Sequence, residues 1–148
     1  FYLYGYFREV RPIPYLLGNE TRAAYLARVL PEYATSQFIS QRLPQDAKIY
    51  LLFIGRRGYY CERDYFHDGG ELPAFLLGAI QSAGEPAQVE GMLRREGMTH
   101  LMVRTDLLAR YLVNNLPPAK ITLWNAFETS RLSLSFQDSG YALYQLHG

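Results

Sequence analysis

The chain contains two short, mainly apolar runs, at residues 48–54 and 99–103, in which hydrophobic positions do not alternate with polar ones. Such runs are typical of strands that are covered on both faces of a parallel sheet. We therefore predict that the two runs lie side by side, in parallel, at the centre of one sheet. Five of their side chains should be mostly buried: Ile49, Leu51, Phe53, Leu101 and Val103.

Apolar residues at helical spacing precede and follow these runs and predict helices around the sheet. Asn19 or Thr21 caps the first helix and Pro31 ends it, Gly97 stops the fourth, and Pro117 ends the fifth. The predicted helices cover residues 21–30, 32–42, 73–82, 86–96, 105–114 and 124–130.

Three further segments predict strands. Residues 132–137 and 141–146 surround an Asp-Ser-Gly turn, which predicts a closing antiparallel hairpin. Residues 59–65 predict a more exposed strand, which three consecutive charged residues weaken. The fold class is therefore α/β: a small open sheet with central parallel strands flanked by helices and a C-terminal antiparallel hairpin.

Composition indicates one domain with a substantial core. The chain has 148 residues, 49% of them hydrophobic, with 15 basic against 14 acidic side chains. The nearly balanced charge creates no field that would favour nucleic acid. The single cysteine, Cys61, excludes an internal disulfide and a zinc cluster built on cysteines. We expect residues 1–148 to form a single soluble α/β domain without a cofactor.

The first residues favour a position near a membrane. The aromatic cluster at residues 1–7 reaches its first charge at Arg8, as is typical of the water-facing edge of a membrane helix. An N-terminal strand or helix docked on the core is the alternative. Two prolines favour extended backbone at residues 11–17. No run approaches the ~18 apolar residues of a membrane span. We therefore expect a piece of a longer protein, with residues 1–18 as an extended, membrane-proximal lead-in.

The loop after the first apolar run carries the candidate binding residues. In open α/β sheets, ligands bind beyond the carboxyl ends of the strands. Arginine offers planar paired donors to phosphate, and tyrosine offers a face to a sugar ring or a position at a lipid interface. The alternative is a solvated turn whose arginines pair with nearby carboxylates. The candidate ligand or acceptor contacts are Arg56, Arg57, Tyr59, Tyr60, Arg63 and Tyr65.

We assign no catalytic residue and no metal ligand. His67 and Asp68 are neighbours in a Gly-rich loop, without a second histidine to complete a metal site. Cys61 and His67 could form a nucleophile and its base, but we interpret Cys61 as structural. His100 is either a core histidine or a residue at the rim of the sheet.

Short phrases spread over nearly the whole chain carry a resemblance to a known family. They are PYLLGNETR at residues 14–22, LPQDAKIY at 43–50, YYCER at 59–63, LRREGMTHLMV at 93–103 and SGYALYQL at 139–146. In this order they resemble the C-terminal soluble region of bacterial multi-pass glycosyltransferases of the protein O-mannosyltransferase and aminoarabinose transferase superfamily. The pairing of Leu-Pro-x-Asp-Ala-Lys with Gly-x-Thr-His is the most specific part.

The resemblance implies where the chain works. In that superfamily the membrane portion binds a polyprenyl-phosphate-linked sugar, and the acidic catalytic residues lie in early loops that precede this region. No catalytic motif of the family maps onto this sequence. The resemblance therefore implies a non-catalytic periplasmic domain, tethered by upstream membrane helices at the extracytoplasmic face of the bacterial inner membrane. It would assist acceptor recognition or cover the membrane active site. Its partners would be the membrane portion of the same chain and a lipid-linked sugar or acceptor, but not nucleic acid.

Two other functions stay open from the residues alone. A structural or protein-interaction domain with no role in sugar transfer would need no ligand groups in the loop. An independent enzyme or nucleotide binder would use Arg56, Arg57 and residues 59–68, although the loop lacks the G-x-G-x-x-G spacing of dinucleotide sites. Fold alone cannot separate these functions, because α/β sheets host many of them. The resemblance favours the accessory domain, which we expect to be inactive by itself even where the whole protein is a transferase.

Overall fold

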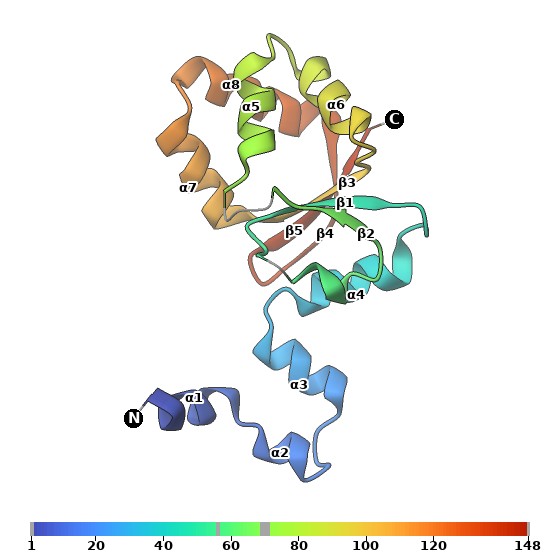
Figure 1. Ribbon diagram of the computed structural model, residues 1–148, viewed down its shortest axis with the longest axis vertical. Coiled ribbons are helices and arrows are strands. Elements are labelled where there is room, and N and C mark those ends of the chain that lie inside the picture. Colours follow the sequence, from blue (N-terminus) through green and yellow to red (C-terminus); the bar gives the residue numbers. More distant parts are fainter. Residues whose placement is uncertain (1, 56, 69–71, 148) are drawn as a thin grey trace.

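The computed structural model describes residues 2–55, 57–68 and 72–147, which contain a five-stranded sheet with helices on both faces (Figure 1). The strands are β1 (Lys48–Leu52), β2 (Asp64–Phe66), β3 (His100–Arg104), β4 (Leu132–Asp138) and β5 (Tyr141–Leu146). They stand in the order β2-β1-β3-β5-β4. β1 is parallel to β2 and β3, and β5 is antiparallel to β3 and β4. This arrangement confirms the predicted fold class.

The central pairing of β1 with β3 is the predicted one. Ile49 lies opposite His100, and Leu52 lies opposite Val103, in a parallel register. The predicted strand ends early, because Phe53 adopts a left-handed conformation with φ of 60° and is only half-buried. The other four side chains of the predicted core are buried. One face of the pair contributes Tyr50, Leu52, Leu101 and Val103 to a larger core, and the other contributes Ile49, Leu51 and Met102 to a smaller one.

Two helical layers cover the sheet (Figure 1). The larger core is covered by α5 (Ala74–Ser82), α6 (Pro86–Arg95), α7 (Thr105–Asn115) and α8 (Pro118–Arg131). The smaller core is covered by α4 (Tyr33–Arg42), where Ile39 is fully buried and Phe38 stacks on Phe136 of β4 with 4.7 Å between ring centroids. α8 begins well before the predicted residue 124, because Pro118 occupies the first helical position, where its missing N–H is no loss.

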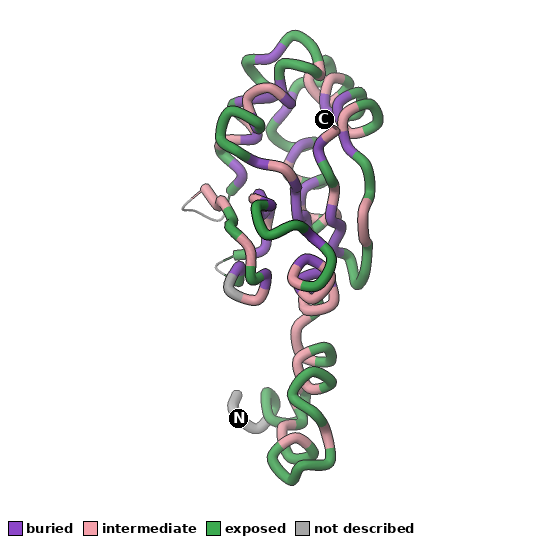
Figure 2. Tube along the Cα trace, turned by 90° about the vertical axis from the view of Figure 1, so that its right-hand side faces the viewer, coloured by how far each residue is buried: buried purple, intermediate pink, exposed green. Residues whose placement is uncertain are grey.

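Three short helices precede α4 and form the N-terminal arm (residues 2–30): α1 (Tyr2–Val10), α2 (Ile13–Leu16) and α3 (Arg22–Val29). The arm extends away from the sheet at one end of the molecule (Figures 1 and 2). The predicted extended backbone at residues 11–17 is wrong, because proline fits the first turn of a helix and α2 begins there. Within the described residues, no helix is long and apolar enough to cross a membrane.

The arm is held together by its own polar contacts. Arg28 donates to the carbonyls of Val10 and Arg11 at 2.7 and 3.1 Å and pairs with Glu20 at 2.9 Å. Thr21, one of the two predicted caps, caps α3, since its hydroxyl accepts the backbone N–H of Ala24 at 3.2 Å. Among the described residues of α2 and α3, no side chain is buried. Tyr15 also stacks on Tyr25 with 4.9 Å between ring centroids, and none of the side chains described for residues 5–30 is buried.

The predicted strand at residues 59–65 is wrong over most of its length. A 3₁₀ turn, Gly58–Tyr60, takes its first residues, and Glu62 interrupts the extended backbone with φ of 48°. The strand β2 starts only at Asp64, where it joins β1 in parallel.

We expect Leu143→Ala to lower the free energy of unfolding by about 2–5 kcal/mol, because it empties a site in the smaller core where Leu143 is fully buried. Leu134→Ala on the neighbouring strand is the matched control. The Leu134 side chain is 54% exposed, so its loss should cost less than about 0.5 kcal/mol. Urea unfolding followed by circular dichroism measures both, and equal losses would contradict the assigned faces of the hairpin.

Candidate functional site

The edge loop (residues 53–63) leaves β1 at the carboxyl edge of the parallel strands and returns to the amino end of β2, where Asp64 lies opposite Lys48. Arg57 therefore follows the carboxyl end of β1, whereas Arg63 and Tyr65 lie at the opposite end of the parallel strands, which differs from the predicted placement at the carboxyl edge. Arg56 lies outside the described residues, and Tyr59 is described only through its backbone in the 3₁₀ turn. The remaining candidates, Arg57, Tyr60, Arg63 and Tyr65, lie in or directly after the loop. They differ in what they contact.

Arg57 joins the edge loop to the start of α4. Its Nη1 donates to Oε1 of Glu32 at 2.8 Å, and Glu32 is 1% exposed whereas the Arg57 side chain is 52% exposed. The other carboxylate oxygen of Glu32 is buried and, like the Thr35 hydroxyl, has no hydrogen-bond partner among the described residues. Because a buried carboxylate is costly without a counter-charge, Arg57 stabilises Glu32 in addition to any ligand it contacts.

Two further residues at this edge were not singled out from the sequence. Tyr141 begins β5 and lies opposite Arg104, the last residue of β3. Burial raises the pKa of the Tyr141 hydroxyl and the charge of Glu32 raises it further, whereas Arg104 and Arg57 act in the opposite direction. The hydroxyl is therefore within electrostatic reach of a buried acid and two arginines. We call these four residues, Glu32, Arg57, Arg104 and Tyr141, the edge cluster.

Arg63 acts as an internal clamp. Its Nε donates to the Pro44 carbonyl at 2.9 Å, and its Nη2 donates to the carbonyls of Ser40 and Leu43, each at 2.8 Å. Its Nη1 donates to the Glu62 carbonyl at 2.8 Å. Carbonyls at the end of α4 have no partner within the helix, and Arg63 supplies one from the edge loop. Its guanidinium therefore fixes the loop against α4.

The two candidate tyrosines whose side chains are described, Tyr60 and Tyr65, have different surroundings. Tyr60 packs edge-on against Tyr33 with 5.9 Å between ring centroids. Tyr65 is 40% exposed and stacks on His67 at 6.4 Å. A Cβ at Gly58 would come within 2.7 Å of the Tyr65 ring, so a larger residue at this position would displace it. Tyr65 thus keeps part of its ring in solvent, where a sugar or a lipid headgroup can reach it.

Cys61 and Asp68 have structural partners. Cys61 is fully buried, its Sγ lies 3.8 Å from the Ser36 hydroxyl, and burial raises the pKa of the thiol, which lowers its reactivity. Asp68 accepts the Tyr50 hydroxyl at 2.7 Å and the Phe75 N–H at 3.0 Å, which ties the chain after β2 to the start of α5. Burial, together with Asp68, raises the pKa of Tyr50. Among the described residues, no group of three or more His, Cys, Asp or Glu side chains could hold a metal ion.

His100 is a core histidine, one of the two predicted alternatives. It is 6% exposed, and its Nδ1 lies 2.8 Å from the Thr99 hydroxyl. Burial lowers its pKa, so the neutral ring is favoured. His100 therefore supports the packing of the sheet centre.

Comparison with known proteins assigns the fold. The chain is a mixed α/β domain whose sheet has a parallel centre and an antiparallel hairpin. No protein-family model and no curated protein matches the sequence. A solved structure shares the fold: the C-terminal globular domain of an oligosaccharyltransferase from Archaeoglobus fulgidus, with a TM-score of 0.53 and 7% sequence identity over 80% of this chain and 97% of that one. At this identity the likeness shows the fold, and no residue role is carried over from it.

We expect Arg63→Ala to lower the free energy of unfolding by about 2 kcal/mol, because partly buried backbone carbonyls lose a charged donor. Arg63→Lys should recover little, since an ammonium cannot reach the same set of carbonyls. Arg42→Ala, at an exposed position in the last turn of α4, is the control and should cost less than about 0.5 kcal/mol. Unfolding in urea measures all three, and an Arg63→Ala protein as stable as the wild type would rule out the clamp.

Proposed function

We propose that this chain is the extracytoplasmic domain of a membrane glycosyltransferase that uses a polyprenyl-phosphate-linked sugar. The observation that carries the proposal is the fold shared with a domain of an oligosaccharyltransferase. The resemblance of the sequence phrases to bacterial multi-pass transferases supports the same class. In this proposal the membrane portion of the same chain performs the transfer. The present domain covers that active site or helps to recognise the acceptor.

The surface of the N-terminal arm supports a position next to a membrane. Five of its large apolar side chains are exposed, from 53% at Tyr6 to 72% at Leu16. Arg8 and Arg11, with apolar neighbours, line a hollow of about 470 Å³. Exposed aromatic and basic residues together favour the interface of a bilayer, where rings lie at headgroup level and guanidinium groups meet phosphate. An apolar surface of this kind is unusual when it faces only water.

The arm and the 3₁₀ turn of the edge loop lie on the same side of the sheet (Figure 1). α4 and the 3₁₀ turn of the edge loop lie on the arm side of the sheet, whereas α5 to α8 lie on the far side (Figure 1). With the arm at a membrane surface, the edge loop would face that surface as well. Arg57 and Tyr65 would then meet a lipid phosphate, a lipid-linked sugar or the acceptor, which is the contact that the sequence predicts.

Deletion of the gene that encodes this chain should leave a polyprenyl-phosphate sugar unused. We expect this donor to accumulate in lipid extracts and the same sugar to disappear from envelope lipids or proteins, both measured by mass spectrometry. The intact gene on a plasmid should restore both pools. Unchanged pools in the deletion strain would contradict the proposed class and favour a structural or protein-interaction domain.

The deletion strain also tests the edge loop. Replacing Arg56 and Arg57 together with Ala in the full-length protein should reduce sugar transfer about tenfold, the size of effect expected for charge-assisted contacts to phosphate. Because this change also leaves Glu32 uncompensated, the triple variant with Glu32→Gln removes the buried charge. Activity that returns in the triple variant would assign the effect to stability.

Arg42→Ala controls for the loss of a surface charge. If the Arg56 and Arg57 variant is expressed and active like the wild type, the edge loop is a solvated turn and makes no contact with substrate.

A further inference from the structure

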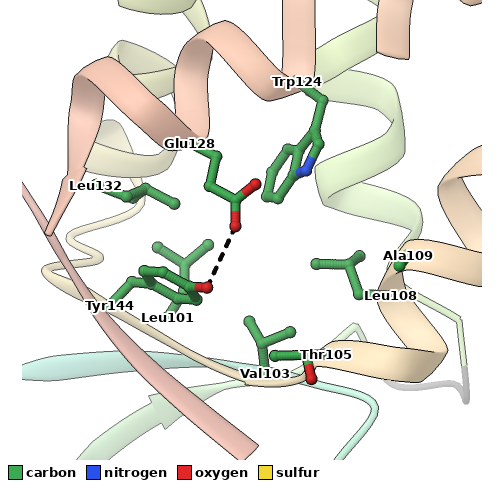
Figure 3. A pocket seen from close by; sticks show the side chains of 9 residues that line it. All are labelled: Leu101, Val103, Thr105, Leu108, Ala109, Trp124, Glu128, Leu132 and Tyr144. Carbon is green, nitrogen blue, oxygen red and sulfur yellow. Dashed lines mark hydrogen bonds between the residues drawn. The ribbon is translucent and has the colours of Figure 1, made fainter. Parts of the chain in front are cut away.

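A cavity of about 190 Å³ lies between the sheet and the helices α7 and α8, on the face of the sheet opposite to α4 (Figure 3). Leu101 and Val103 of β3 line one wall, and Leu108 of α7 lines another. Glu128 and Tyr144 bring polar atoms into this apolar space from α8 and β5 (Figure 3). The lining residues belong neither to the edge loop nor to the N-terminal arm.

The polar feature of the cavity is a carboxylate held by one hydroxyl. The Tyr144 hydroxyl donates to Oε1 of Glu128 at 3.2 Å. Burial, together with Glu128, raises the pKa of Tyr144 to about 12, so the hydroxyl remains a donor at neutral pH. The Thr105 hydroxyl donates to the Gly140 carbonyl at 3.1 Å, so it does not act as a second donor to Glu128. Oε2 of Glu128 has no hydrogen bond within the part of the chain that the structure describes, and Figure 3 shows the carboxylate beside Trp124.

A second glutamate of the same helical layer, Glu90, differs from Glu128 in its charged partners. Glu90 of α6 accepts Nε of Arg94 at 3.0 Å and Nη1 of Arg131 at 3.4 Å, so two guanidinium groups neutralise it. Glu128 has no ion pair with any described residue. Glu128 is half-buried, and the one hydroxyl that it accepts carries no charge to pair with the carboxylate. The missing charge is therefore the property that a ligand of this cavity would supply.

The walls and the size of the cavity indicate the chemistry and the size of the ligand. Trp124 and Tyr144 present aromatic rings on two sides of the carboxylate (Figure 3). Aromatic rings and a carboxylate together favour an organic cation, whose alkyl groups also contact the leucine and valine walls. The volume of about 190 Å³ has room for a small amine.

We propose that this cavity binds a small alkylammonium ion, with the ammonium group on Glu128 and the alkyl part between Trp124 and Leu108. The inference is independent of the proposed role in sugar transfer, because it uses the opposite face of the sheet. If the cavity binds no amine, the proposed role in sugar transfer is unaffected, and the reverse also holds.

The single tryptophan of the chain, Trp124, makes the cavity visible to spectroscopy. The whole chain is titrated with n-butylammonium chloride, and with n-butanol and sodium butyrate as the neutral and anionic equivalents at constant ionic strength. We expect a saturable change of the indole N–H resonance and of the fluorescence in the millimolar range for the cation. Butanol and butyrate should bind at least about tenfold more weakly, because they leave the carboxylate without a counter-charge.

Three variants locate the response. Glu128→Gln keeps the shape and removes the charge, and it should weaken binding about tenfold, whereas Glu85→Gln, in an exposed position before α6, should leave it unchanged. Ala109→Phe fills the cavity from the exposed side of α7 and should abolish the response, which keeps the test valid where Glu128→Gln does not fold. No saturable response, equal affinity for butanol, or undiminished binding by either cavity variant would overturn the proposal.

Discussion

The parallel pairing of β1 with β3 is the constraint on which the rest of the structure depends. Both strands are buried on both faces, so their side chains fix which helices cover each side. Thr99 sets the register: its N–H donates to the Lys48 carbonyl at 2.9 Å, and its hydroxyl accepts the Lys48 N–H at 3.1 Å. Nζ of Lys48 donates to the Glu96 carbonyl at the end of α6 at 2.7 Å. A slip of one residue would exchange the two faces, so these contacts protect both cores.

The same pairing creates the edge loop, because parallel strands end at one edge of the sheet. The chain leaves β1 in left-handed conformations at Phe53 and Gly55, with φ of 60° and 66°. Such a conformation costs roughly 1–2 kcal/mol at a residue other than glycine. Within the loop, Arg63 donates to carbonyls at the end of α4, and Ile54 and Cys61 are buried in the smaller core. The shape of the loop therefore depends on polar contacts and on apolar packing together.

The fold and the position of the loop could be predicted from the sequence because their signals are local. An unbroken apolar run, an Asp-Ser-Gly turn and a threonine before a helix each report on their own neighbourhood. The roles of the loop residues could not be predicted, because their partners lie far away in the sequence. Arg57 pairs with Glu32 across 25 positions, and Arg63 reaches Ser40 across 23. Glu32 looks like a surface residue at a helix start, and nothing local signals its burial. The pair of Glu128 and Tyr144 is separated by 16 positions and matches no motif.

The strand β5 connects the two polar regions of the molecule. Tyr141 and Tyr144 are three residues apart, and the odd spacing places them on opposite faces, one in the smaller core and one against the larger. Burial raises the pKa of both hydroxyls, and each lies near a glutamate: Glu32 for Tyr141 and Glu128 for Tyr144.

The two glutamates differ in how their charge is neutralised. Glu32 is fully buried and pairs with Arg57 through one oxygen, which holds the edge loop on α4, whereas its other oxygen has no hydrogen-bond partner among the described residues. Glu128 lines a cavity, accepts one hydroxyl, and has no cation beside it among the described residues. An acid kept only for structure would gain from an internal partner, as Glu90 does from Arg94 and Arg131. The fold itself thus supplies a counter-charge to Glu32, and the proposed alkylammonium ion would supply one to Glu128.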